Sequence, residues 1–184
     1  MGKRKLSEGE KFISEYFKYS GIEYDCEVKL KNLKDDNKGH REPDFYLPKY
    51  KIYVEFNGKW NTSDLEKERY REKKVIYYRN NIPCIYLYPE NLGIIDFVFT
   101  NRLIEELKKH SLKKELFRFQ TKRFIDDRGA LFLWLFLSIF ILFGDFNWDE
   151  DRSILLIFFG IIIFQVYRLI VGVKKFYVEN EIQF

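Results

Sequence analysis

Cysteine is scarce in this 184-residue chain, which contains only Cys26 and Cys84. So few thiols argue against a scaffold held by disulfides and fit a protein of a reducing compartment. Each cysteine lies in an apolar, strand-like pattern, so we expect two buried free thiols, with a single disulfide as the alternative. Residues 1–10 are basic and polar and lack the apolar stretch of a signal peptide, so we expect no signal peptide.

A strong charge of either sign is lacking as well. The chain has 32 Lys and Arg against 28 Asp and Glu, a formal net charge of +4. The basic excess lies before residue 129, whereas the remaining residues carry more acids than bases. A mildly basic region of this kind can bind nucleic acid or anionic lipid, although many soluble proteins are as basic.

Two short strands joined by a tight turn are predicted over residues 42–48 and 52–60. Alternate residues of a strand point to opposite faces, so Glu55 and Asn57 share one face of the second strand. Strand-forming residues flank Glu55, which we therefore expect in a half-buried sheet, with Asp44 on the neighbouring strand. A carboxylate there is costly unless it is paired or binds a cation. The pattern thus indicates a divalent metal between the two carboxylates.

The other expected elements of the polar region follow from caps and periodicity. Ser-x-x-Glu capping boxes open two helices, and apolar alternation or apolar runs mark the strands. In chain order we expect a helix from Ser7 to about residue 20, a strand over 24–30, a helix over 63–80, a strand over 81–88 and a helix over 94–110.

Pro43-Asp44 at the start of one strand and Glu55 near the end of the next resemble the PD-(D/E)xK nuclease superfamily. Within that superfamily the chain is similar to the small very-short-patch-repair-like endonuclease domains. The order of elements over residues 7–110 matches the α/β, restriction endonuclease-like αβββαβ core. The resemblance implies hydrolysis of phosphodiester bonds with Mg²⁺, or Mn²⁺ in its place, and nucleic acid as the substrate, with DNA expected and RNA open.

The resemblance also implies a ligand set for the metal. Asp44, Glu55 and the main-chain carbonyl of Phe56 would hold the ion. Glu10 lies on the inward face of the first helix, where related nucleases carry a glutamate that assists the metal site, here through water. The alternative is that Glu10 only caps its helix.

One family residue is missing, because Asn57 stands where the superfamily has a lysine two positions after the acid. In relatives without that lysine, the following helix often supplies the basic residue. By spacing, Lys73 is the best match, and Lys74 and Lys59 are weaker substitutes. In the repair-endonuclease branch a side chain at the position of Asn57 acts beside the metal. His40 could contact a phosphate or be a solvated loop residue.

The composition changes abruptly at residue 129. Two apolar stretches separated by a short acidic connection predict a transmembrane helical hairpin over residues 129–175. Lys and Arg flank both outer ends, which places both termini in the cytoplasm by the positive-inside rule. Residues 111–128 would form a basic amphipathic connecting helix and 176–184 a short cytoplasmic tail. The alternative is an apolar hairpin buried in a soluble domain or oligomer.

Taken together, the sequence predicts a membrane-anchored, metal-dependent endonuclease of the cytoplasmic membrane, with the nuclease-like domain over residues 1–110. One alternative is a nuclease fold that has lost activity and serves as a binding module. The other is a membrane-anchored sensor or scaffold whose basic helices bind lipid headgroups or a partner protein. No base-reading motif is visible, so sequence preference and oligomeric state stay open.

Overall fold

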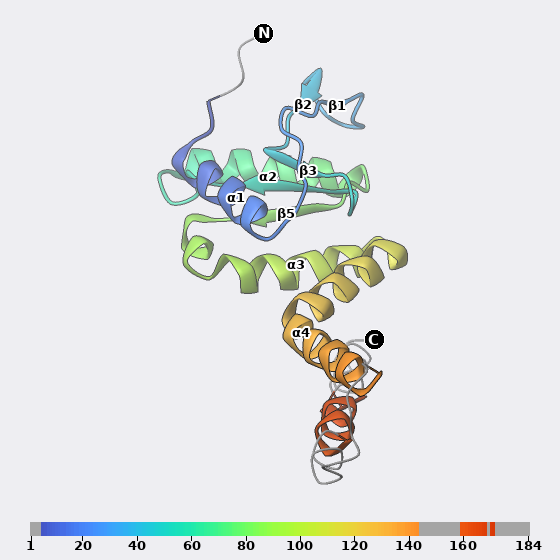
Figure 1. The fold of residues 1–184 in the computed structure, drawn as a ribbon. Coiled ribbons are helices and arrows are strands. Elements are labelled where there is room, and N and C mark those ends of the chain that lie inside the picture. The colour runs from blue at the N-terminus through green and yellow to red at the C-terminus, as the bar shows by residue number, and fades with distance from the viewer. Residues whose placement is uncertain (1–4, 144–158, 169, 172–184) are drawn as a thin grey trace, which may run out of the picture. The chain divides into compact units, whose positions relative to one another are not determined.

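The computed structural model describes residues 5–143, 159–168 and 170–171. The chain divides into two compact units, Met1–Phe119 and Gln120–Phe184. The first unit contains the strands and most of the helices, and it holds every residue predicted above for the active site (Figure 1). The fold of the described residues is mixed α/β with small sheets, as the sequence predicted at this level.

The strands form two small sheets. The main sheet has the order β3-β4-β5, in which β3 (Phe45–Leu47) and β4 (Ile52–Phe56) are an antiparallel hairpin and β5 (Cys84–Leu87) is parallel to β4. A separate antiparallel ribbon joins β1 (Leu30–Lys31) to β2 (His40–Arg41). The antiparallel hairpin and the strand after the second long helix were both predicted from the sequence.

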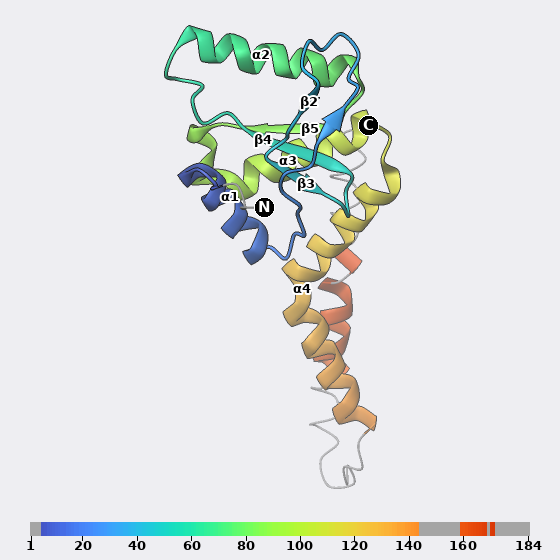
Figure 2. The same ribbon diagram turned by 90° about the horizontal axis from the view of Figure 1, so that it is seen from above.

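Helices cover both faces of the main sheet. Figures 1 and 2 show α2 and α3 on opposite sides of it, and α1 packs with α3. The 3₁₀ helix η1 leads from β5 into α3. The helical elements are α1 (Glu8–Tyr19), α2 (Asp64–Arg79), η1 (Pro89–Ile94), α3 (Ile95–Lys109) and α4 (Lys113–Phe143).

The predicted helix starts are confirmed. Ser7 caps α1 in a complete capping box, in which its own N–H donates to Glu10 Oε2 at 2.7 Å. Ser63 caps α2 by accepting a hydrogen bond from the N–H of Glu66 at 3.2 Å. The carboxylate of Glu66 lies 3.0 Å from Arg69 and so pairs within its own helix. Local caps therefore set where both helices begin.

The two faces of β4 enter two different hydrophobic clusters. Ile52 and Val54 pack in the larger one, with α1, α3 and the start of α4. Tyr53 contacts the smaller one, which contains Tyr77 of α2. The alternation predicted for this strand is confirmed, but the degree of burial was underestimated. Because α2 covers the face expected to be half wet, only 2% of Glu55 is exposed.

The strand predicted over residues 24–30 is wrong. Asp25 forms an isolated bridge with Tyr46, and regular pairing begins only at Leu30 in β1. Glu27 has φ 63, a left-handed conformation that interrupts an extended run. The main sheet therefore has three strands, within the described residues, where the αβββαβ order predicts four. Cys26 is consequently exposed. Neither cysteine forms a disulfide, but burial is confirmed only for Cys84.

The C-terminal predictions are partly covered by the described residues. Helix α4 continues to Phe143 through the predicted boundary at residue 129, and residues 159–168 are also helical. Over the ranges that the structure describes, no helix combines the length and apolarity needed to span a membrane. The remainder of the predicted hairpin over 129–175 and the whole tail over 176–184 lie outside the described residues.

Candidate active site

The strand register brings the two predicted carboxylates together. Phe45 pairs with Val54, so one further step along the antiparallel hairpin sets Asp44 opposite Glu55. Residues directly opposite on antiparallel strands point to the same face. Both side chains are buried, and Asp44 Oδ2 accepts a hydrogen bond from the N–H of Phe56 at 2.8 Å. This bond fixes Asp44 against the strand that carries Glu55.

Helix α2 supplies the immediate partners of Glu55. Lys73 Nζ lies 2.5 Å from Glu55 Oε1, and the Tyr77 hydroxyl donates to the same oxygen at 2.9 Å. Lys73 and Tyr77 are four residues apart and so share one face of the helix. Lys73 also donates to the main-chain carbonyl of Glu42 at 3.3 Å. The lysine singled out by spacing therefore lies beside the predicted acid, and its catalytic role stays a prediction.

The burial of Glu55 changes its protonation. Removal from water raises the pKa of Glu55 to about 7; the ammonium of Lys73 opposes the rise, and the negative charge of Asp44 adds to it. Burial and the neighbouring Glu55 charge also raise the pKa of Tyr77, which therefore stays a hydrogen-bond donor. A carboxyl group that exchanges its proton near neutral pH, beside a lysine and a second acid, is typical of a functional site.

The donor atoms fit a hard divalent cation. Carboxylate and carbonyl oxygens are the ligands that Mg²⁺ prefers, and Mg²⁺ commonly keeps several waters with only one or two carboxylates. A cation between Asp44 and Glu55 would also favour the charged form of Glu55. Within the part of the chain that the structure describes, no three His, Cys, Asp or Glu side chains form a group able to ligate one ion. The candidate metal ligands are therefore the two carboxylates and the main-chain carbonyl of Phe56.

Glu10 has the structural role that the sequence offered as one alternative. Its carboxylate closes the capping box of α1, and 6% of the residue is exposed. It does not join Asp44 and Glu55 in a group of three ligands. Assistance to a metal through water stays a prediction for this residue.

The remaining sequence candidates lie around the same strand. Asn57 is buried just after β4, and its N–H donates to Leu87 O at 2.7 Å. The N–H of Lys59 donates to the Tyr70 hydroxyl at 3.3 Å. Lys74 lies over the ring of Tyr86, 5.3 Å from its centroid, on a different side of α2 from Lys73. Of the three candidate lysines, Lys73 is therefore the one that contacts Glu55.

A cleft of about 270 Å³ opens beside Lys73. Sequence reasoning missed most of its wall, because the residues are far apart in the chain and each resembles an ordinary solvated charge. Arg41 is held by Asp36 and Glu72, both at 2.7 Å, and its hydrogen bonds to these acids raise its pKa. His40 lies 3.2 Å from Glu42. The wall is formed by Lys38, His40, Arg41, Glu42, Arg69, Tyr70 and Lys73.

The comparisons with known proteins found no matching family model, no similar curated protein and no similar solved structure.

Proposed function

We propose that this protein is a metal-dependent nuclease in which Asp44, Glu55 and Lys73 are the catalytic residues. The observation that carries the proposal is the 2.5 Å ion pair between Lys73 and the buried Glu55, with Asp44 beside it. Burial of charged groups costs free energy, and apolar side chains of similar size are often as stabilising. A catalytic role therefore explains this buried ion pair better than a contribution to folding stability does.

The chain's own residues have distinct tasks in this proposal. Asp44 and Glu55, with the carbonyl of Phe56, would hold Mg²⁺ or Mn²⁺. When bound, such an ion supplies Lewis-acid stabilisation of phosphate charge and lowers the pKa of a bound water. Lys73 offsets the charge of Glu55 and, at the wall of the cleft, faces the negative charge that develops on a phosphate. Glu10 and Asn57 would act only as supporting groups.

The cleft beside Lys73 supports nucleic acid as the substrate. Cationic side chains from two separate parts of the chain line it, including Lys38 and Arg69. Contacts of this kind bind phosphates without reading base sequence. We propose DNA as the substrate, and RNA is tested beside it.

We further propose that residues 129–175 anchor the protein in the cytoplasmic membrane, with both termini on the cytoplasmic side. The apolar composition of this segment and the Lys and Arg at its flanks support the proposal. An anchored nuclease would act close to the membrane, for example on incoming foreign DNA. Alkaline carbonate extraction of membranes from expressing cells tests this, because an embedded chain stays in the pellet and a peripheral one is released.

A second candidate function is an inactive nuclease fold that binds a partner. Asn57 at the position of the superfamily lysine favours it, as does the lack, among described residues, of a third acidic ligand. In this case Asp44 and Glu55 would be dispensable for function.

The decisive experiment uses the purified full chain in mild detergent. Plasmid DNA, single-stranded DNA and RNA are incubated with Mg²⁺, with Mn²⁺ or with EDTA. Cleavage that requires metal and is lost in Asp44→Asn and in Glu55→Gln supports the enzyme. Glu68→Gln is the matched control, because Glu68 is an exposed acid of α2, and it should cut normally.

Two results would contradict the proposal. Metal-dependent cutting that survives both site substitutions would place the active site elsewhere. A folded protein that cuts none of the substrates and binds no Mn²⁺ by calorimetry would favour the inactive binding module.

A further inference from the structure

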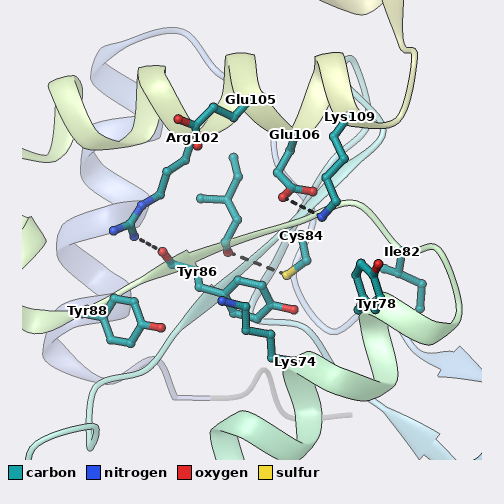
Figure 3. A pocket seen from close by; sticks show the side chains of 11 residues that line it. Lys74, Tyr78, Ile82, Cys84, Tyr86, Tyr88, Arg102, Glu105, Glu106 and Lys109 are labelled. Carbon is teal, nitrogen blue, oxygen red and sulfur yellow. Dashed lines mark hydrogen bonds and ion pairs between the residues drawn. The ribbon is translucent and has the colours of Figure 1, made fainter.

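A second cavity lies on a different side of α2 from the cleft. Its volume is about 380 Å³, and α2, β5, the residue after β5 and α3 form its walls (Figure 3). Three tyrosines and three cationic residues contribute to the lining. They are Tyr78, Tyr86, Tyr88, Lys74, Arg102 and Lys109.

Each cation in this cavity lies over an aromatic ring. Lys74 Nζ is 5.3 Å from the ring centroid of Tyr86, and Lys109 Nζ is 5.5 Å from that of Tyr78. The guanidinium of Arg102 is 5.7 Å from the Tyr88 centroid, and it also donates to the main-chain carbonyl of Tyr86. Aromatic faces next to cations are the groups that bind the bases and phosphates of a single nucleic-acid strand.

The charge of the cavity favours a ligand with an aromatic part. Glu105 and Glu106 of α3 also line it, and Glu106 lies 3.2 Å from Lys109. Three cations and two acids leave only a small positive excess, which is weak attraction for a phosphate alone. Stacking must therefore contribute to binding. Tyr78 is 72% exposed, which leaves ring surface for a base beside Lys109, and the acids can accept hydrogen bonds from the amino groups of a base.

A series of neighbouring rings joins this cavity to the cleft beside Lys73. Tyr88, in the cavity, lies edge-on to Trp60 with centroids 5.1 Å apart. Trp60 lies 6.3 Å from Tyr70, which lines the cleft. Arg69 lies over Tyr70 at 5.3 Å. The two cavities are thus linked by the same kind of side chains that line them.

We infer that the second cavity is a subsite for an unpaired nucleotide, on a single strand of nucleic acid that also crosses the cleft. This inference rests on the proposed nuclease function and names the substrate form. Bases in a duplex are stacked and paired, so they present no free face to rings inside a pocket. A single strand does, and the stacking chemistry is shared by DNA and RNA.

Fluorescence anisotropy of labelled oligonucleotides on the full chain tests the inference. The probes are oligothymidine, oligouridine and the oligothymidine–oligoadenosine duplex, all in EDTA so that binding is measured without cleavage. We expect the single strands to bind about tenfold more tightly than the duplex. Lys74→Ala and Tyr78→Leu should each weaken single-strand binding by about fivefold. Lys74 and Tyr78 are exposed, so both variants should fold.

Matched substitutions outside the cavity are the controls. Lys67→Ala lies on the same helix, and Tyr19→Leu replaces a tyrosine of α1 that is 94% exposed. Both should bind like the unmodified chain. Equal or tighter binding of the duplex, or cavity variants that bind like the controls, would overturn the subsite. Intact, cavity-dependent binding without cleavage under any metal would refute the nuclease and leave the subsite standing.

Discussion

Replacing Glu55 with Gln should stabilise the protein at alkaline pH while abolishing cleavage. Glu55 is buried, and the pKa rises from an ordinary value of 4.5 to about 7 because burial disfavours the charge. The substitution removes that charge and keeps an oxygen that can accept the hydrogen bond of the Tyr77 hydroxyl. Stability and activity should therefore change in opposite directions.

The size of the effect follows from proton linkage. The folded chain holds the Glu55 proton more tightly than the unfolded chain, so this group lowers the free energy of unfolding as pH rises from 4.5 through 7. Each pKa unit corresponds to about 1.4 kcal/mol, so the penalty above pH 7 is roughly 3 kcal/mol. The pKa of Glu55 already includes the attraction between its carboxylate and Lys73. In the Glu55→Gln protein, however, the ammonium of Lys73 stays without its counter-ion, and this reduces the gain in stability. We expect a net gain of about 1 to 3 kcal/mol at pH 8.

Urea unfolding followed by circular dichroism at pH 5 and pH 8 measures this prediction. The gain should be large at pH 8 and small at pH 5, where Glu55 is mostly protonated. Glu68→Gln, an exposed substitution on α2, should change stability little at either pH. A Glu55→Gln protein that is less stable at pH 8 would show that the ion pair outweighs the cost of burial, and would refute the reasoning.

Three further predictions follow from the same unit. Lys73→Met should abolish plasmid cleavage and lower stability at pH 8 by only about 1 kcal/mol, because Glu55 without its cation takes up a proton and so limits the loss, whereas Lys67→Met should do neither. Arg41→Ala should destabilise the chain by about 2 to 4 kcal/mol in urea, since Asp36 and Glu72 lose the guanidinium that both contact at 2.7 Å; a change below 0.5 kcal/mol would contradict this. Cys26 is exposed and should react with an aromatic disulfide reagent at once, whereas the buried Cys84 should react only in denaturant. A single fast phase for both thiols would contradict this prediction.

The features predicted correctly depend on short stretches of sequence. Ser7 and Ser63 mark helix starts because each cap is completed by the residue three positions later. Alternation along β4 identified the face that carries Glu55. Spacing along α2 singled out Lys73, because residues three or four apart share a helix face. These are local rules, and the structure brings two of the residues they identified, Glu55 and Lys73, into contact.

The features that sequence reasoning missed depend on contacts between distant segments. Residues 24–30 alternate like a strand, but alternation records only polarity, and no pattern revealed the left-handed conformation of Glu27. The burial of Glu55 depends on α2, which packs on the sheet through the buried residues Ile76 and Tyr77. These two residues are difficult to recognise in the sequence, because most of the helix is charged. The cleft wall combines residues about thirty positions apart, so no single stretch could indicate it.

The missing strand lysine favours the inactive module, whereas the proposed function assigns its task to Lys73. Asn57 lies two residues after Glu55, just beyond β4, while Lys73 contacts Glu55 from α2. Only 3% of Asn57 is exposed, so a lysine there would bury a second ammonium two residues from Glu55. Two like charges in a buried site disfavour one another. Under the proposed function, a lysine supplied by α2 therefore disfavours one supplied by the strand, and a neutral residue such as Asn57 is expected there.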